Sequence, residues 1–322
     1  MPTVKLEPKV QSIIKEGRNP FELIIIGGGP AGLAAGIYAK RSGIDVVLIE
    51  KALPGGLITT TDLVENYPGF PDGISGTELG QKLEDQAKKF GLDIVFGKAI
   101  KIGIKNSIKE VYTEEHSYSS KAVIIATGSE PKKLGVSGEE SFIGKGISYC
   151  ATCDGPFYKD KNVAVIGGGN GALEEAIFLT KFAKLVTIIH RRKEFRADKV
   201  LQEKASANPK IFFKLNALVE EIKGNDKVSS LKLKDTLSGK RSSINVDGVF
   251  IYAGFKPNTD FIKDVIKLDE DSYVIADEKL ATNIDGIFAA GDVRKKGLRQ
   301  VVTSVADGAV AANSVKEYLT RT

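Results

Sequence analysis

The 322-residue sequence contains only two histidines and two cysteines, and this scarcity excludes several kinds of site. A structural zinc site usually takes about four Cys or His ligands, and neither histidine lies near the cysteines in the sequence. Only two residues separate Cys150 from Cys153, so a disulfide between them closes almost no loop and cannot act as a scaffold. A redox-active pair is what remains, with an inert buried pair as the alternative.

Long apolar runs are also missing. No stretch approaches the ~18 apolar residues of a membrane-spanning helix, and the longest aliphatic runs, such as Leu23–Ile26, fit buried strands. The first 20 residues contain no apolar core of a signal peptide, so we expect a cytoplasmic protein that does not associate with membranes. Hydrophobic residues make up 42% and charged residues 27%, which fits a globular chain with two domains of roughly 100–200 residues each.

Charge of one sign is not in large excess either. The 46 basic and 41 acidic residues leave a net charge of +5, which does not indicate a nucleic-acid-binding protein. Glycine, in contrast, is abundant, with 34 residues against 11 prolines. Such an excess favours tight turns and a close approach of the backbone to a ligand.

The first half of the chain contains a glycine-rich turn between aliphatic runs. Glu22–Gly27 leads into Gly27-x-Gly29-x-x-Gly32, an alanine-rich segment continues to about Ser42, and Asp45–Glu50 follows. Strand, glycine turn, helix and strand in this order predict a βαβ unit on a buried parallel sheet.

A second unit repeats this pattern without a gap. Asn162–Gly167 leads into Gly167-x-Gly169-x-x-Ala172, a helix-like segment runs to about Ala183, and Leu185–His190 follows. Corresponding positions of the two units, such as Glu50 and His190, lie 140 residues apart. One such motif is weak, but two in register, each directly after a strand, favour dinucleotide-binding folds over ordinary glycine turns.

Further aliphatic runs end in glycine, at Lys121–Gly128, Asp247–Gly254 and Gly286–Gly291. Ligands gather at the carboxyl ends of strands in open α/β sheets, so these ends are candidate cofactor contacts. Since the second βαβ unit lies between the first two runs, the sequence predicts an α/β protein with two Rossmann-like dinucleotide-binding domains, the second inserted into the first.

We expect the first dinucleotide-binding domain at 1–128 and 254–322, and the inserted dinucleotide-binding domain at 129–253. The two chain crossings between them are expected at Ser129–Lys133 and Phe255–Asn258, and the Lys-rich stretch near Ser230–Ser243 is expected to form a hairpin with a solvated face.

The residue at the end of the second strand selects the nucleotide. A carboxylate there, as at Glu50, accepts hydrogen bonds from a ribose diol and repels a 2′-phosphate, which suits FAD or NAD(H). The second unit instead has His190 followed by Arg191, Arg192 and Arg196, whose guanidinium groups match a 2′-phosphate. We therefore expect FAD in the first domain and NADPH in the second, with a solvated basic helix start as the alternative for the arginines.

The Cys-x-x-Cys pair stands just before the second unit. In such a pair one thiolate attacks and its neighbour resolves, and a helix N-terminus lowers the pKa of a thiol. The adjacent Asp154 could act as an acid toward a departing thiolate. The alternative for Asp154 is a helix or turn cap.

The sequence resembles the low-molecular-weight thioredoxin reductases over nearly its whole length after about residue 20. The resemblance is carried by C-A-T-C-D-G from Cys150, G-G-G-N-x-A from Gly167 and H-R-R-x-x-x-R from His190, and by Gly55-Gly56 with Thr59–Thr61, Val64–Gly69, Ala126–Gly128, Gly291–Val293 and Arg299-Gln300. It implies a homodimeric FAD enzyme that passes electrons from NADPH through the flavin and the Cys pair to thioredoxin. It also implies that the NADPH-binding domain rotates between half-reactions.

The motifs and the resemblance together give a set of candidate site residues. The catalytic candidates are Cys150, Cys153 and Asp154. The candidate FAD contacts are Gly27, Gly29, Pro30, Ala31, Gly32, Glu50, Gly55, Gly56, Thr61, Asn66, Ala126, Thr127, Gly128, Gly291, Asp292, Arg299, Gln300 and Val301. The candidate NADPH contacts are Gly167, Gly169, Asn170, Gly171, Ala172, His190, Arg191, Arg192 and Arg196. We expect no metal site.

Two positions depart from the family pattern. Leu57 stands where the family often has Gln after the Gly-Gly pair, which removes one polar contact on the flavin side. Gly171 stands where Ser or Thr is usual, which loses a hydroxyl near the pyrophosphate but keeps the backbone N–H groups.

Functions other than thioredoxin reduction would use some of the same sites. The same machinery could serve another protein disulfide, such as that of a glutaredoxin-like or peroxiredoxin-linked partner. A flavoprotein redox sensor without turnover needs no matched donor site, and an NAD(P)H oxidase needs no Cys pair. The dithiol and the basic cluster together therefore favour a disulfide reductase.

Overall fold

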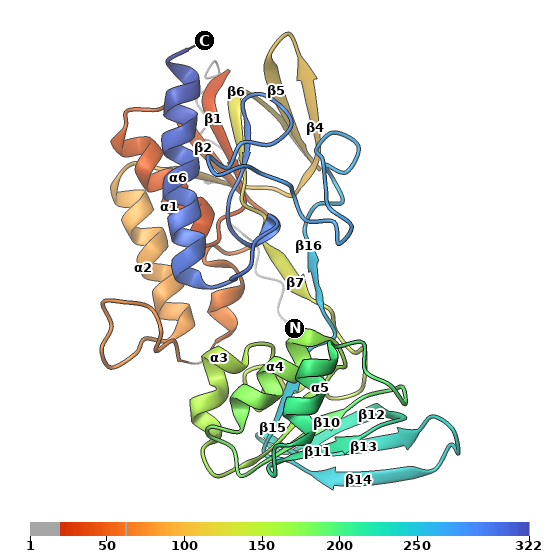
Figure 1. Cartoon of the computed structure of the whole chain (residues 1–322). Helices are drawn as coiled ribbons and strands as arrows, with labels where there is room; N and C mark the ends of the chain where they lie inside the picture. The colour runs from red at the N-terminus through yellow and green to blue at the C-terminus, as the bar shows by residue number, and fades with distance from the viewer. Residues whose placement is uncertain (1–19, 62, 322) are drawn as a thin grey trace. The chain divides into compact units, whose positions relative to one another are not determined.

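The computed structural model describes residues 20–61 and 63–321, which form two compact units (Figure 1). Among these residues, unit 1 comprises 20–61, 67–130 and 256–321, and unit 2 comprises 63–66 and 131–255. Residues 1–19, where a signal peptide was sought, lie outside the described part of the chain. No helix in the described ranges is long and apolar enough to cross a membrane.

Unit 1 is built on a seven-stranded sheet of order β3-β2-β1-β6-β5-β4, with β17 also paired to β6. β1, β2, β3, β6 and β17 are parallel, and β4, β5 and β6 form an antiparallel meander. The strands are β1 (Phe21–Ile26), β2 (Val46–Glu50), β3 (Asp93–Phe96), β4 (Ala99–Lys105), β5 (Ile108–Thr113), β6 (Ser117–Ile125) and β17 (Ile287–Ala289).

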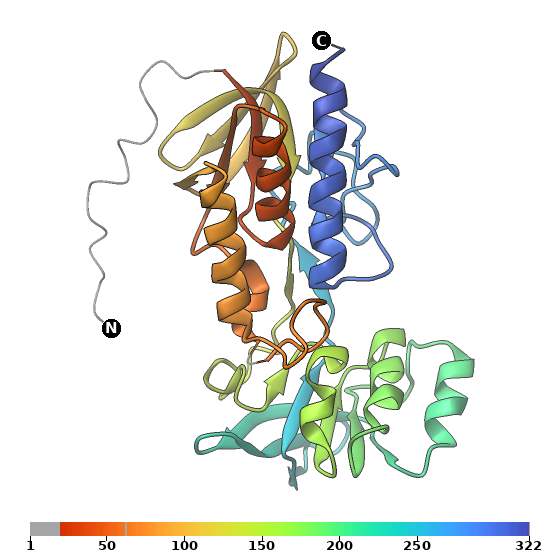
Figure 2. The same ribbon diagram turned by 90° about the vertical axis from the view of Figure 1, so that its left-hand side faces the viewer.

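Three helices lie side by side on one face of this sheet (Figure 2). They are α1 (Pro30–Arg41), α2 (Gly76–Lys89) and α6 (Val301–Leu319), with the short 3₁₀ helices η2 (Gly56–Thr60) and η5 (Gly291–Val293) at the connections. Ile24 and Ile26 of β1 belong to an apolar cluster with Ile102 of β4 and Val111 of β5. The aliphatic runs of β1 and β2 are therefore buried on both faces, as a covered parallel sheet requires.

Unit 2 is built on a five-stranded parallel sheet of order β11-β10-β9-β15-β8. An antiparallel sheet of order β12-β13-β14 packs on it. The elements of unit 2 are β8 (Ile147–Ser148), β9 (Asn162–Ile166), β10 (Leu185–Ile189), β11 (Ile211–Lys214), β12 (Ala217–Gly224), β13 (Val228–Asp235), β14 (Arg241–Asn245), β15 (Gly248–Ile251), α3 (Ala151–Asp154), α4 (Asn170–Leu179), α5 (Lys199–Ser206), η3 (Glu140–Phe142) and η4 (Gly155–Tyr158).

Side-chain alternation along β9 separates two cores in unit 2. Val163 and Val165 pack in the cluster that contains the buried residues of α4, such as Leu173. Ala164 and Ile166 pack in the cluster that contains the inner face of β12 and β13. The parallel sheet is thus the middle layer between helices and a second sheet, which explains its continuous apolar sequence.

Two short strands lie at the chain crossings between the units. β7 (Ser129–Pro131) and β16 (Phe255–Pro257) pair as a two-stranded sheet. Beyond the paired strands, the Lys132 N–H donates to the Gly254 carbonyl at 2.8 Å, and the Asn258 N–H donates to the Gly128 carbonyl at 3.0 Å.

The predicted α/β class with a parallel sheet in each half is confirmed, and so are the strands of both glycine-turn units. The expected hairpin near Ser230–Ser243 is β13 and β14. The helix expected to reach about Ala183 was wrong, because α4 ends at Leu179. Beyond it, the N–H groups of Lys181 and Phe182 bond to carbonyls three residues earlier, so the chain tightens and leaves the α-helical path.

Candidate active site

The glycine turn of unit 1 places the start of α1 directly against the end of β1. Gly27 has a φ of 106°, which disfavours other residues, and an ideal Cβ at Gly32 would lie 1.8 Å from the Gly27 carbonyl oxygen. Gly29 is the N-cap of α1 and provides no side-chain cap, and Pro30 starts the helix. The first N–H groups of α1 and the helix dipole therefore favour an anionic group here.

Glu50 lies beneath this turn, at the carboxyl end of β2 as predicted. The carboxylate is buried and accepts hydrogen bonds from the N–H groups of Gly28 at 2.5 Å and Ala52 at 2.9 Å. A carboxylate has about four lone-pair positions, so capacity remains for a diol. The side chain thus both fastens the turn and is chemically suited to the ribose contact predicted for it.

Other predicted residues of unit 1 gather at the same sheet edge. The Gly55 N–H donates to the Gly28 carbonyl at 2.8 Å, and an ideal Cβ on Gly56 would lie 3.0 Å from Gly29 Cα. The remaining predicted FAD contacts of unit 1 follow β6 or β17, end η2, or form the start of α1 and α6: Ala31, Thr61, Ala126, Thr127, Gly128, Gly291, Asp292, Arg299, Gln300 and Val301. Asn66 belongs to the short segment 63–66 of unit 2, and its contact with FAD stays a prediction.

Thr127 and Gln300 have defined local partners. The Thr127 hydroxyl donates to the Asn258 carbonyl at 2.8 Å, and the Asn258 side-chain amide donates back to the Thr127 carbonyl at 2.9 Å. Gln300 is the N-cap of α6 and forms a reciprocal capping box with Thr303. These bonds fix the backbone at two of the predicted contacts.

Asp307 is a site residue that the sequence analysis missed. From α6 its carboxylate accepts bonds from the Gly291 N–H at 2.9 Å, from Arg294 at 2.9 and 2.8 Å, and from the Lys296 ammonium at 3.0 Å. Burial acts to raise the pKa of Asp307, but the bonds from Arg294 and the charge of Lys296 bring it below its ordinary value. The only sequence signal was one acidic residue in an otherwise small and apolar stretch of helix.

Asp292 lies in the loop that Asp307 holds. The Ser304 hydroxyl donates to its Oδ1 at 3.2 Å, and the Lys296 ammonium lies 3.6 Å away. Burial raises the pKa of Asp292, and Lys296 opposes this rise. Arg299, nearby in sequence, stacks with its guanidinium 4.1 Å over the Tyr273 ring, and its buried Nε has no hydrogen-bond partner among the described residues.

The glycine turn of unit 2 also ends in an uncapped glycine at the start of a helix, but its first glycine, Gly167, lacks the positive φ of Gly27. Gly169 is the N-cap of α4 and provides no side-chain cap, and ideal Cβ atoms at Gly169 and Gly171 would meet no described atom within 4 Å. At the closed end of the turn an ideal Cβ on Gly167 would lie 2.7 Å from Ala172 Cβ. The Asn170 side chain is engaged by Asp198 through bonds of 2.8 and 2.9 Å. The open side of the turn again offers free N–H groups to an anion.

His190 lies beneath this turn, where Glu50 lies in unit 1. Its buried ring stacks on Phe195 with centroids 5.4 Å apart, and its Nε2 lies 3.1 Å from the Glu194 carbonyl. An ideal Cβ on Gly168 would lie 2.3 Å from the ring. Burial lowers the pKa of His190, and the neighbouring arginine charges lower it further. The ring therefore fills space in its uncharged form, and a contact between His190 and a cofactor stays a prediction.

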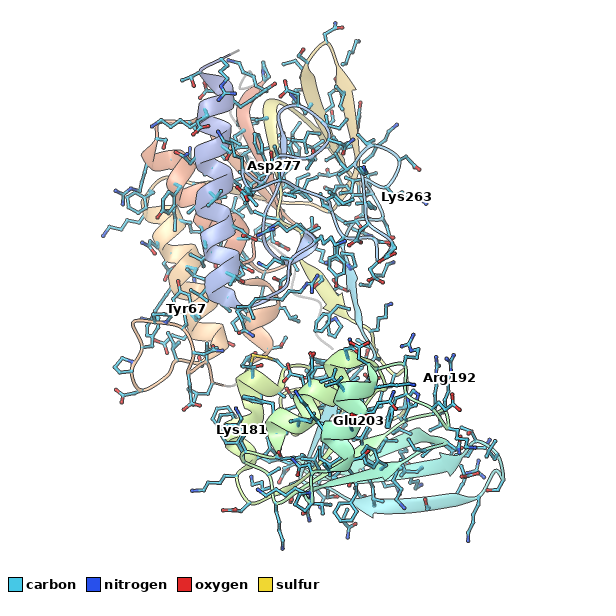
Figure 3. All side chains as sticks on the ribbon, viewed as in Figure 1. Tyr67, Lys181, Arg192, Glu203, Lys263 and Asp277 are labelled. Atoms are coloured by element: carbon cyan, nitrogen blue, oxygen red, sulfur yellow. A yellow bond between two sulfur atoms is a disulfide. The ribbon has the colours of Figure 1, made fainter. Side chains whose placement is uncertain are left out.

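The three arginines of the basic cluster are exposed. The Arg196 N–H donates to the Gly168 carbonyl at 2.8 Å, which puts Arg196 beside the glycine turn. The Arg192 side chain points away from the sheet (Figure 3). Within the described ranges none of Arg191, Arg192 and Arg196 forms an ion pair with an acidic side chain. Their guanidinium groups are thus available to an incoming anion.

Cys150 and Cys153 form a disulfide with their Cα atoms 5.3 Å apart, visible in Figure 3 as a yellow bond. Cys150 is the N-cap of α3, and its Sγ accepts the Cys153 N–H at 3.2 Å. Ser148 supports the turn, since its hydroxyl accepts the Cys150 N–H and donates to the Cys150 carbonyl. Both cysteines are partly exposed, which does not fit an inert buried pair.

Asp154 is the last residue of α3 and the N-cap of η4. Its side chain makes no capping bond at η4, so the structure gives no support to the capping alternative there. Together with burial, the charge of its carboxylate raises the pKa of the Tyr252 phenol. Tyr252 is a second residue that the sequence analysis missed.

Tyr252 follows β15 directly, and its hydroxyl oxygen accepts the Ala151 N–H at 2.7 Å. Burial raises the pKa of Tyr252, and the carboxylates of Glu175 and Asp154 raise it further. Burial also raises the pKa of Glu175, which lies on α4. The available signal was the position of Tyr252 within the predicted strand end Asp247–Gly254.

The described part of the chain contains no group of three or more His, Cys, Asp or Glu side chains that could hold a metal ion.

A family model and a curated relative both match this chain over most of its length. The family model for pyridine nucleotide-disulphide oxidoreductases matches residues 21–308. A thioredoxin reductase of Peptoclostridium acidaminophilum is 44% identical over 307 residues, which cover 94% of this chain and 98% of that protein.

Two solved structures have similar sequence identity to this chain but different TM-scores. The thioredoxin reductase of Streptococcus pyogenes is 46% identical with a TM-score of 0.90, covering 94% of this chain and 99% of that one. The thioredoxin reductase of Lactococcus lactis in its FR conformation is 40% identical with a TM-score of 0.66, covering 94% and 100%.

Proposed function

Since the chain belongs to the pyridine nucleotide-disulphide oxidoreductases, and among them to the low-molecular-weight thioredoxin reductases, we propose that it passes electrons from NADPH through FAD to the disulfide of thioredoxin. The observation that carries the proposal is the position of the Cys150–Cys153 disulfide in the same unit as the glycine turn with the basic cluster. A dithiol and a matched electron-donor site on one unit are what a disulfide reductase needs.

FAD is proposed for unit 1. The uncapped start of α1 suits a pyrophosphate, and Glu50 suits a ribose diol. The buried Nε of Arg299, which has no hydrogen-bond partner in the described part of the chain, and the Asp292 carboxylate add polar groups in the segments that follow β17. These residues fit the group, and Leu57, about half exposed, supplies no polar contact where the family often has one.

NADPH is proposed for unit 2. The uncapped start of α4, open at Gly169 and Gly171, suits a second pyrophosphate. Arg191, Arg192 and Arg196 supply the charge that a 2′-phosphate needs, and no carboxylate lies beneath the turn to repel it.

The overall reaction consumes NADPH, a proton and the disulfide of thioredoxin, and yields NADP⁺ and the dithiol. FAD held at the glycine turn and Glu50 of unit 1 would supply the two-electron redox chemistry that links NADPH to the Cys150–Cys153 disulfide. One cysteine of the resulting pair attacks the disulfide of thioredoxin as a thiolate and forms a mixed disulfide, which its neighbour resolves. Asp154, adjacent in sequence, is proposed to give the proton to a departing thiolate.

Replacing either cysteine tests the proposal. Cys150→Ser and Cys153→Ser should each abolish thioredoxin reduction, while NADPH still bleaches the flavin absorbance. Substantial turnover with thioredoxin in either variant would show that the pair does not carry the electrons.

We also propose that unit 2 rotates between half-reactions. Hydride transfer and thiol exchange each need reacting atoms within ~3–3.5 Å of one flavin, and one rigid unit cannot hold both groups there at once. The paired crossings β7 and β16 are short enough to act as a hinge. The TM-scores of 0.90 and 0.66 at equal coverage of this chain are what family members differing in domain placement would give.

Thioredoxin and a second copy of the chain are the proposed partners. The names of the relatives support thioredoxin, and assays with glutaredoxin-like and peroxiredoxin-linked proteins would show whether another disulfide is preferred. Mass measurement by light scattering would test the homodimer. Leu298, Val302 and Val310 give unit 1 exposed apolar side chains around α6, which suits an interface.

A further inference from the structure

Tyr252 connects the disulfide turn to the glycine turn of unit 2. Its backbone N–H donates to the Ile166 carbonyl at 2.8 Å, and its hydroxyl oxygen accepts the Ala151 N–H at 2.7 Å. The missing side chain of Gly167 makes room for it, because an ideal Cβ there would lie 3.2 Å from Tyr252 Cβ. One side chain thus spans from the end of β9 to the start of α3.

The Ala151 N–H needs such a partner. The first N–H groups of a helix have no acceptor within the helix, and Ala151 is fully buried, so water does not replace the missing bond. The neighbouring donors are already matched, since the Cys150 N–H bonds to Ser148 Oγ and the Cys153 N–H bonds to Cys150 Sγ. The Tyr252 hydroxyl completes this set of bonds around the disulfide.

The phenol is a stable acceptor over the pH range in which thiols titrate. Burial keeps Tyr252 protonated, and Glu175 on α4 and Asp154 on α3, the charged groups that act on it, disfavour its ionisation further. The phenol therefore stays protonated, and its oxygen stays able to accept the Ala151 N–H, over the pH range in which the cysteines titrate.

We propose that Tyr252 is a positioning residue for the dithiol, because its hydroxyl holds α3 so that the Cys153 N–H stays directed at Cys150 Sγ. This inference rests on the proposed function of the cysteine pair. After reduction, the same N–H would stabilise a thiolate on Cys150, and a stabilised thiolate is the reactive form near neutral pH. Tyr252 would then set the reactivity of the pair without touching sulfur.

Tyr252→Phe tests this by removing a single oxygen. The FAD-loaded full chain is reduced, and the rate of Cys150 alkylation by iodoacetamide is followed against pH by peptide mass spectrometry. Loss of the hydroxyl should loosen the Cys153 bond to Cys150 and raise the titration midpoint by ~0.5–1 unit, a roughly threefold to tenfold slower reaction at pH 7. The kcat for thioredoxin should fall similarly while KM for NADPH stays unchanged.

Tyr149→Phe is the matched control. It also removes a phenol oxygen next to the pair in sequence, but that hydroxyl bonds Glu139 Oε1 at 3.1 Å and not α3. Its alkylation profile should match that of the unaltered chain. A Tyr252→Phe profile that is unchanged or moves to lower pH would overturn the proposal, even if the variant melts at a lower temperature.

A double variant gives an independent check. Replacing Ala151 with lactic acid, which puts an ester oxygen in place of the backbone N–H, removes the donor that Tyr252 accepts without adding any atom to this buried position. In that background Tyr252→Phe should cause no further shift of the midpoint, and an additive shift would contradict the proposed role. Alkylation requires neither NADPH nor thioredoxin, so these outcomes stay distinct from a failure of the proposed function.

Discussion

The two glycine turns of this molecule each join a strand to an uncapped helix start, and they differ in the side chain that lies beneath the middle glycine. In unit 1 the carboxylate of Glu50 accepts the N–H of the middle glycine, Gly28, at 2.5 Å. In unit 2 the uncharged ring of His190 packs against the middle glycine, Gly168. The Gly168 carbonyl accepts a hydrogen bond from the Arg196 N–H. The carbonyl of each middle glycine accepts a backbone N–H, from Gly55 in unit 1 and from Arg196 in unit 2, so the turns differ in whether a charged hydrogen bond or ring packing supports them.

Under the cofactor assignment proposed above, this difference would adapt one βαβ unit to two nucleotides. The buried acid of unit 1 stabilises its turn and would repel a 2′-phosphate by charge. Removing that acid in unit 2 requires another support for the turn, and the stacked ring of His190 supplies it while leaving the arginines to act on the ligand. Selectivity and turn stability are therefore coupled in unit 1 and separated in unit 2.

Short of removing a cysteine, the largest expected effect concerns the chemistry that only unit 2 carries. Asp154→Asn keeps the shape of the side chain but cannot supply a titrating proton, so kcat for thioredoxin reduction should fall by ~10²–10⁴-fold. The amount of bound FAD, measured by absorbance, should be unchanged, because the FAD site is proposed in unit 1. A normal rate with an unchanged pH profile would return Asp154 to a capping role.

The basic cluster gives the next effect. Arg191→Ala combined with Arg192→Ala should lower kcat/KM for NADPH by roughly tenfold or more, because each charge-assisted bond is worth ~1.5–3 kcal/mol. NADH, which lacks the phosphate, should be little affected in the same steady-state assay. Lys193→Ala, in the same exposed run, is the matched control, and equal losses with both nucleotides would refute the assignment.

The two middle glycines should differ in their tolerance of a methyl group. An alanine Cβ at position 168 would lie 2.3 Å from the stacked His190 ring, whereas one at position 28 would lie 3.1 Å from Glu50 Oε2. Gly168→Ala should therefore cost about 1–3 kcal/mol of stability, and Gly28→Ala less. Denaturant unfolding of both variants checks the order. Equal losses of unfolding free energy would mean that the His190 ring moves aside without cost.

The smallest effect is the pH dependence of the His190 packing. Because the folded-state pKa of His190 is lowered, the unfolded chain binds the proton more readily. The stabilisation is present above the ordinary histidine pKa of ~6.5 and is lost as the pH falls below it. His190→Gln should flatten this part of the melting temperature profile, and an identical acid slope in both proteins would speak against it.

The backbone of both units could be predicted well because its signals are local. Aliphatic runs ending in glycine mark β1, β2, β9 and β10, and the 140-residue repeat gives their order. The position of Glu50 follows from the same repeat. The early end of α4 could not be predicted from the sequence, because Thr180–Ala183 contains neither glycine nor proline to end the helix.

The residues that the sequence did not reveal act across long separations. Tyr252 meets Ala151 over 101 residues, and Asp307 meets Gly291 from another element. Whether a tyrosine at a strand end accepts a bond from a distant helix depends on which segments the fold brings together. Neither its residue type nor its spacing carries that information, so the supporting residues of the site emerge only from the three-dimensional structure.

The pairing of β7 with β16 has a consequence for the modular history of the chain. Residues 128 and 132 bond to residues 258 and 254, so the two strands run in opposite directions and the ends of the insertion meet. A segment with adjoining ends can be excised or exchanged without cutting the sheet of unit 1. A short turn from Glu130 to Lys256 would join the two strands across the gap left by unit 2, and the reverse operation is a route by which a gene segment could have entered unit 1.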